Sequence, residues 1–304
     1  MASANILPAA RSIDPRPLIP GGNRWAALMG PAISLLVLAA VIYQLRTIDP
    51  RQTLSMVPAS GAFWLLFALY YLAQPFSEWL IYRRLWRLPA RGIGALLAKL
   101  VSNEILLGYL GEVYFYGWAR RHAHLATAPF GAIKDVAILS AVVGNVLTLV
   151  LAILAWPLLG SLPLGLDSLA LKASIACVLL SSIVPMLFRR KLFSLPRADL
   201  LMVMGLHAVR AVGMIVLAAA MWHLLLPSVP LAWWVLLCAL RQILSRLPFL
   251  PNKDLVFAGI AAFLAGAHGG IAEVMALMAS LLLCAHLCMG AVLGAAELAR
   301  GGWR

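Results

Sequence analysis

Seven ionisable side chains lie inside long apolar stretches of the sequence, where a charge is expensive. Each costs roughly 2.5–3.5 kcal/mol at the centre of an inserted helix, so such residues usually belong to ion pairs, binding sites or proton pathways. An arginine at depth also offers a planar set of donors that fits a phosphate or a carboxylate. These residue types therefore favour the binding of a charged group away from bulk water. The seven are Glu104, Glu112, Asp135, His207, Arg210, Glu273 and His286.

The stretch NEILLGYLGEVYFYGWARRH, which begins at Asn103, concentrates this chemistry. Glu104 and Glu112 are eight residues apart and would lie about 80° apart on a continuous helix, on one broad face. Gly108 and Gly111 supply flexible backbone for a break in that helix. Asn103 supplies a polar side chain that can cap a helix end freed by the break. The pattern predicts an interrupted segment that carries two carboxylates.

Arg210 lies in the middle of the run LMVMGLHAVRAVGMIVL, too deep for its side chain to reach water easily. Two interpretations are open. In the first, Arg210 forms a structural ion pair with Glu104 or Glu112. In the second, Arg210 faces the phosphate of a lipid, and a glutamate balances its charge when the site is empty. The second interpretation predicts a hydrophilic groove lined by the substrate-binding residues Asn103, Glu104, Glu112 and Arg210.

Simpler roles are predicted for the other polar residues. His207 is expected to hydrogen-bond a neighbouring carbonyl group, and Glu273 to cap the last helix, where a negative charge favours the positive end of the dipole. Glu78 is predicted to lie at the membrane interface, near Arg83. His286 lies between two cysteines, but three residues of one helix cannot enclose a metal ion tetrahedrally. We therefore predict no metal and no cofactor.

The composition places these residues in a membrane. The chain is 63% hydrophobic and 12% charged, whereas a soluble domain carries about 25% charged residues. Mean hydropathy is +0.94 over 304 residues, which predicts an all-α integral membrane protein. Residues 1–24 are expected to form a mobile basic tail, and residues 25–299 a single transmembrane domain. A spanning helix needs about 20 mostly apolar residues, and seven full crossings are predicted, at residues 25–45, 58–82, 132–156, 168–188, 198–222, 229–246 and 272–297.

The net charge of +13 comes largely from short basic clusters between the apolar stretches. Such clusters are typical of cytoplasmic loops, so they indicate membrane orientation rather than nucleic-acid binding and place the N-terminus in the cytoplasm. Basic residues 83–91 and 119–124 flank the stretch 93–118, and a single straight crossing would put one cluster outside. We therefore predict that residues 93–118 form a re-entrant or broken helix, which survives at membrane depth only inside protein or beside a wet cavity.

A second interrupted segment is predicted at residues 248–270, where Pro248 and Pro251 precede a short apolar run that ends in glycines. Paired interrupted segments in the two halves of a membrane protein point to a central transport site. The sequence lacks an Asp-rich magnesium motif, a Gly-x-Ser-Gly motif, HEXXH and a Walker loop. This absence leans against an enzyme.

Three functions stay open on these grounds. The leading hypothesis is a lipid transporter, acting without nucleotide hydrolysis on a phospholipid, a modified lipid or a polyprenyl-linked lipid. The second is a membrane-embedded transferase that acts on a lipid head group. The third is a non-catalytic scaffold, in which Glu104 and Arg210 would form a closed ion pair with no cavity around them. Membrane lipids are the predicted partners, and a homo-oligomer is left open.

Part of the sequence resembles a known family. The stretch that begins at Asn103 resembles an "Asn … Pro-Gly-x-x-Gly-Glu" element of the lysylphosphatidylglycerol synthase transmembrane-region family. This family is the flippase-like domain of the multiple peptide resistance factor. SRLPFLPNKD, residues 245–254, resembles the proline turn of that family, and the likeness in segment spacing covers roughly residues 25–299. The matching residues of the first element are Asn103, Gly108, Leu110, Gly111 and Glu112, followed by Arg120 and Arg121.

The chain departs from the family pattern at several positions, which identifies it as a divergent member. Leu107 stands where the family usually has proline, and Phe115 where a basic residue commonly follows. Asn252 and Lys253 replace glycines of the second element, and Ala258 falls near its expected glutamate.

The resemblance implies a multi-pass protein of the bacterial inner membrane that moves a lipid between leaflets. It also implies a cavity lined by the two interrupted segments. Aminoacyl-lipid synthesis is not expected, because the sequence shows no soluble aminoacyl-transferase domain.

Overall fold

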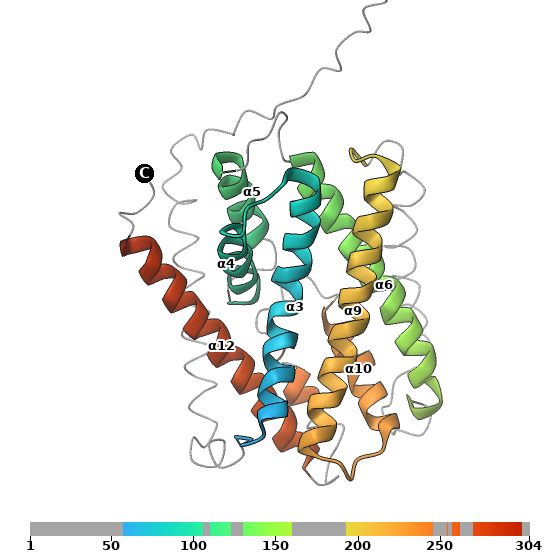
Figure 1. The fold of residues 1–304 in the computed structure, drawn as a ribbon. Coiled ribbons are helices and arrows are strands. Elements are labelled where there is room, and N and C mark those ends of the chain that lie inside the picture. The colour runs from blue at the N-terminus through green and yellow to red at the C-terminus, as the bar shows by residue number, and fades with distance from the viewer. Residues whose placement is uncertain are drawn as a thin grey trace, which may run out of the picture.

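The computed structural model describes residues 57–105, 110–122, 130–159, 193–245, 254, 257–261 and 270–299. The regular structure in this part of the chain is entirely helical, as the composition predicts (Figure 1). The helices with described bounds are α3 (Gly61–Trp86), α4 (Gly92–Ile105), α5 (Leu110–His122), α6 (Phe130–Leu159), α9 (Arg197–Leu225), α10 (Leu231–Ser245) and α12 (Ile271–Ala299).

Three of the described helices are long and apolar enough to cross a membrane, namely α6, α9 and α12. They correspond to the predicted crossings at 132–156, 198–222 and 272–297, with ends that differ by a few residues. Helix α3 is also long, whereas α10 has 15 residues. The predicted crossings at 25–45 and 168–188 lie outside the described residues, so seven crossings stay a prediction.

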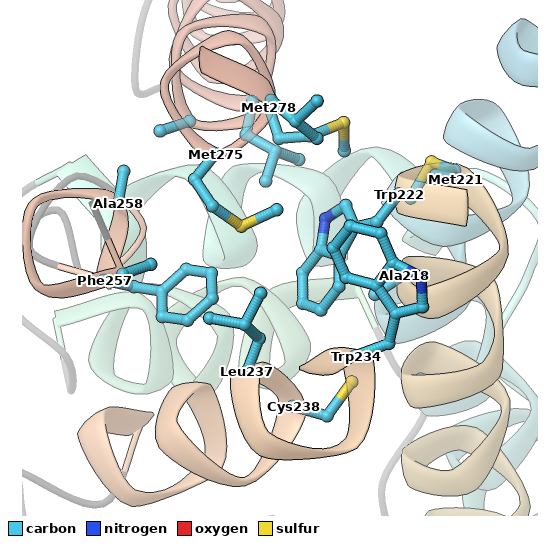
Figure 2. Close-up of a cluster of buried hydrophobic side chains, with 14 of the residues drawn as sticks. Ala218, Met221, Trp222, Trp234, Leu237, Cys238, Phe257, Ala258, Met275 and Met278 are labelled. Carbon is cyan, nitrogen blue, oxygen red and sulfur yellow. The ribbon is translucent and has the colours of Figure 1, made fainter. Parts of the chain in front are cut away.

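Helix α3 occupies a central position, with α9 on one side and α4 on the other (Figure 1). Helix α6 packs against both α9 and α10, and α12 packs against α4. A large apolar core joins α9 and α10 to residues 257–261 and α12, and Figure 2 shows the tryptophan and methionine side chains that fill it. Trp222 and Trp234 meet there at a ring-centroid distance of 5.9 Å. This core fixes α9 and α10 relative to each other, and both helices contribute to the site described below.

The stretch 93–118 is broken into two helices, as predicted. Helix α4 has 14 residues, so it is about 21 Å long and shorter than the ~30 Å hydrocarbon layer. Helix α5 packs against α4 in the opposite direction, because Gly111 meets Asn103, whereas Phe115, one turn later, lies beside Lys99, one turn earlier. We call α4 and α5 together the hairpin. Its position in the membrane stays a prediction.

Gly111 and Asn103 account for the close approach within the hairpin. The Gly111 N–H donates a hydrogen bond to Asn103 Oδ1 at 2.8 Å, which satisfies one of the unpaired donors in the first turn of α5. A Cβ atom at position 111 would lie 2.6 Å from Asn103 Oδ1 and still closer to the backbone oxygen of Lys99. The predicted capping role of Asn103 is seen, whereas Gly111 lies inside α5 as its second residue. Gly108, Pro248 and Pro251, the other predicted break positions, lie outside the described residues.

Replacing Gly111 with alanine should separate α4 from α5, because neither the Lys99 backbone nor the capping amide can move aside cheaply. We expect a loss of about 1–3 kcal/mol of stability, the usual cost of overpacking. Gly117→Ala is the matched control, since a Cβ atom at position 117 meets nothing within 4 Å. Thermal unfolding in detergent measures both variants, and equal melting temperatures would contradict the close-approach explanation.

The hairpin also predicts that the segments before α4 and after α5 lie on the same side of the membrane. Single cysteines at Arg91 and His122, in a chain whose four native cysteines are replaced, should react with an impermeant maleimide from the same side. Labelling of the two positions from opposite sides would show that the hairpin does not return.

A candidate anion site beside a buried ion-pair network

Lys99 joins three helices through two carboxylates. Its Nζ atom lies 2.7 Å from Glu78 Oε2 on α3 and 2.8 Å from Glu112 Oε2 on α5. The Lys99 side chain is only 3% exposed, so neither partner is replaced by water at low cost. Removing one member of a buried ion pair typically costs 3–5 kcal/mol, because the other charge is stranded. This network therefore holds the hairpin against α3.

Aromatic side chains enclose the network. Lys99 Nζ lies 5.8 Å from the centroid of the Phe115 ring, and the Phe115 and Tyr82 rings are 4.8 Å apart. A cation over an aromatic face is attracted by the quadrupole of the ring. Tyr82 and Phe115 are fully buried, so they exclude water from one side of the Lys99 charge.

Arg210 joins the network from α9. Its Nη1 atom lies 3.7 Å from Glu78 Oε1, and its Nη2 atom donates a hydrogen bond to Ser140 Oγ at 2.9 Å. The first of the two interpretations of Arg210 predicts Glu104 or Glu112 as its ion-pair partner. Among the described residues the carboxylate within ion-pair distance is Glu78, so that expectation is wrong.

Glu78 is predicted to lie at the membrane interface near Arg83; in the structure its side chain is buried among the helices, and its depth in the membrane stays a prediction. Glu78 is 5% exposed, whereas Arg83 is an exposed residue at the end of α3. Five residues along a helix turn the side chain by about 140°, so Glu78 and Arg83 point in different directions. Glu78 instead faces inward, where it meets cations from α4 and α9.

A cavity of about 240 Å³ opens beside Arg210, between α3, α4, α6, α9 and α10. Its apolar wall includes Trp222, which also belongs to the core in Figure 2. Four of its described lining residues are of charged types, namely Glu104, Arg210, Arg241 and Asp254. Four others are neutral and polar, namely Gln74, Ser140, Gln242 and Ser245. The cavity is therefore rich in hydrogen-bonding groups although its helices are mostly apolar.

The two arginines of the cavity are bound differently. Arg241 donates from Nε and Nη2 to Asp254 Oδ1, at 3.0 and 2.7 Å, and its guanidinium group lies 5.4 Å from the centroid of the Tyr70 ring. Arg210 Nε, in contrast, is buried and has no hydrogen-bond partner within the described part of the chain. An unsatisfied buried donor costs about 1–3 kcal/mol, so Arg210 retains donor capacity for a ligand or a water molecule.

The structure brings together only part of the predicted substrate-binding set. Glu104 and Arg210 line the cavity, whereas Asn103 and Glu112 are engaged in the hairpin and are not among its described lining residues. Sequence reasoning missed Lys99, Arg241 and Asp254. The first two carry the same signal as Arg210, a cation inside an apolar run. Asp254 is the last residue of the proline-turn stretch 245–254, in which no acidic residue was singled out.

Asp135 and His207 have structural roles in the packing of α6 against α9. Asp135 Oδ2 accepts hydrogen bonds from the backbone N–H groups of Ser194 and Leu195, at 2.6 and 2.7 Å. This contact fixes the chain as it enters α9. His207 Nε2 lies 3.2 Å from the backbone oxygen of Val136, which confirms the predicted bond to a carbonyl group.

The two remaining predicted residues lie in α12, away from the cavity lining. Glu273 is exposed in the first turn of α12, where its charge suits the helix dipole, as predicted. His286 Nδ1 lies 3.1 Å from the Tyr71 hydroxyl group. Within the described residues, no three metal-ligating side chains come together.

Asp135→Ala should destabilise the protein by about 2–4 kcal/mol, because two hydrogen bonds from backbone N–H groups to a charged, buried acceptor would be lost. Asp199→Ala is the control. Asp199 lies in the first turn of α9 and its removal should cost at most about 1 kcal/mol. Chemical denaturation in detergent would rank the two, and an equal loss would rule out a special role for Asp135.

Comparisons with protein-family models, with curated proteins and with solved structures give no match. The functional interpretation therefore depends on the chemistry of the cavity and its neighbouring ion pairs.

Proposed function

We propose that this chain is a membrane protein that moves a lipid between leaflets, with the anionic part of the lipid head group held in the central cavity. The observation that carries this proposal is a polar cavity that receives two guanidinium groups inside a bundle of apolar helices. Guanidinium groups bind phosphate through paired hydrogen bonds. No nucleotide hydrolysis is required by this mechanism.

The volume of the cavity supports a head group as the bound part. Pockets that enclose whole drug-sized ligands usually measure about 300–1,000 Å³, and this cavity measures about 240 Å³. It suits a phosphate group with a small substituent, while two acyl chains would have to stay in the bilayer. Sheltering a polar head group in this way removes much of the desolvation cost that slows spontaneous flipping.

The surface of α9 supports the same arrangement. Val209, Val212 and Val216 are exposed on this helix, whereas Arg210 turns toward Glu78 and the cavity. The positions of the valines, spaced by three and four residues, form one face of the helix. An apolar outer face beside a charged inner face fits a helix with lipid on one side and a polar ligand on the other. A scaffold protein would need no such cavity.

Leaflet exchange in proteoliposomes tests the proposal. The wild-type protein should accelerate the exchange of fluorescent lipids with phosphate head groups, and Arg210→Gln should reduce the added rate at least tenfold, because the neutral amide cannot balance a phosphate. Arg84→Gln, which changes an exposed residue of α3, should leave the rate unchanged.

The lipid panel should include a phosphate diester with an uncharged head group, a zwitterionic phospholipid and an uncharged glycolipid. Wild-type rates equal to those of empty liposomes for every lipid would remove the proposal. An equal loss in the Arg210 and Arg84 variants would remove the assignment of Arg210.

A further inference from the structure

We propose that the Glu78 carboxylate competes with the anion of the head group for Arg210. When the anion binds, it displaces Glu78 from Arg210, and Lys99 holds the displaced carboxylate. This inference rests on the proposed function, because it concerns the same cavity. It makes Glu78 and Lys99 positioning residues that set the affinity of the site without touching the ligand.

The two oxygens of Glu78 are directed at two different cations. Oε2 accepts a hydrogen bond from Lys99 Nζ at 2.7 Å, whereas Oε1 lies 3.7 Å from Arg210 Nη1. The second distance is too long for a hydrogen bond. Glu78 is therefore bound firmly to Lys99 and only loosely to Arg210. When an anion approaches Arg210, Glu78 can give up the weaker contact and keep the stronger one.

Arg210 has the free donors that such an exchange needs. Its Nε atom has no partner in the described structure, and its Nη2 atom is bound to the neutral Ser140 hydroxyl group. A phosphate or carboxylate bound by two parallel N–H groups would satisfy the buried Nε atom. Arg241 lacks this capacity, because Asp254 already receives hydrogen bonds from its Nε and Nη2 atoms. The geometry therefore assigns the anion to Arg210 and a positioning role to Arg241.

Lys99 keeps the displacement from stranding a charge. After Glu78 leaves Arg210, its carboxylate stays beside Lys99, which is also 2.8 Å from Glu112. The two carboxylates then share Lys99 as their cation, and the arriving oxyanion takes Arg210. The ligand chemistry is an oxyanion of the phosphate type, which a lipid head group or free phosphate could supply.

Removing the charge of Glu78 and removing the charge of Lys99 should change the affinity for the anion in opposite directions. Glu78→Gln removes the competitor and should tighten anion binding about tenfold. Lys99→Gln leaves Arg210 as the cation available to Glu78 and should weaken anion binding about tenfold. Loss of packing alone would weaken binding in both variants. Glu273→Gln, an exposed carboxylate on α12, and Lys134→Gln, a partly exposed lysine on α6, should leave the affinity unchanged.

Titration calorimetry in detergent, with a dihexanoyl phosphate diester lipid as the probe, measures these affinities. Inorganic phosphate is titrated in parallel. Binding of the lipid with no binding of phosphate identifies the head group as the source of the anion, and equal binding of both identifies free phosphate as sufficient. Either result supports an oxyanion site, provided that Glu78→Gln tightens and Lys99→Gln weakens binding of the probe that binds.

A double variant separates the exchange from a general change in electrostatic field. If Lys99 acts through Glu78, then Lys99→Gln should change the affinity less than about twofold once Glu78 is glutamine. Additive effects in the double variant, or changes of the same sign in the two single variants, would overturn the inference. Should Lys99→Gln fail to fold, Glu112→Gln replaces it, and this variant should tighten binding about threefold, because Lys99 then serves Glu78 alone. Unchanged or weaker binding would contradict the inference.

The proposed function fails in a different way. If neither probe binds the wild-type protein and Arg210→Gln changes nothing, the cavity does not bind anions at all. If both probe binding and leaflet exchange depend on Arg210, whereas Glu78→Gln does not tighten binding, the transport proposal survives and only the competitor role is lost.

Discussion

The buried contact of Lys99 with Glu78 and Glu112 is the interaction on which the arrangement of the site depends. A lysine with 3% exposure can stay charged there only because two carboxylates surround it. Those carboxylates come from α3 and α5. The contact that compensates the charge of Lys99 therefore also attaches the hairpin to the bundle. The hairpin in turn places the end of α4, with Glu104, beside the cavity.

The network and the cavity are connected through one residue. Glu78 belongs to the buried network, and its other neighbour, Arg210, lines the cavity. A change in the position or pairing of Arg210 at the cavity wall therefore alters the contacts of Glu78 that attach the hairpin to α3. Arg241 and Asp254 form a separate ion pair, which also lines the cavity. Their shorter and doubled hydrogen bonds make that pair the more rigid of the two.

Local features of the sequence were enough to predict the helical class and the interruption of residues 93–118. Composition and the length of apolar stretches depend only on neighbouring residues. Gly111 and Asn103, which make the close contact between α4 and α5, are also near each other in the sequence. The pairing of Arg210 with Glu78 was not predictable in this way, because the two residues are far apart in sequence and several carboxylates could have met Arg210.

Depth along one helix was also a poor guide to burial. Glu78 lies near the basic end of α3, yet its side chain is buried and contacts cations from α4 and α9. Lys99 was overlooked for a related reason: its role depends on the return of α5, which brings Glu112 back beside it. Only the three-dimensional arrangement of the hairpin reveals that contact.

Each guanidinium group in the cavity has a carboxylate as its own neighbour, Glu78 for Arg210 and Asp254 for Arg241. Arginine has no neutral form in proteins, so these carboxylates compensate the charges of the two guanidinium groups as long as no anion is bound. A voltage across the bilayer does about 2.3 kcal/mol of work per elementary charge per 100 mV, and it does little on a compensated pair that moves as a unit. An oxyanion at Arg210 would add one uncompensated charge. The loaded cavity, rather than the vacant one, would then be the state that responds to membrane potential.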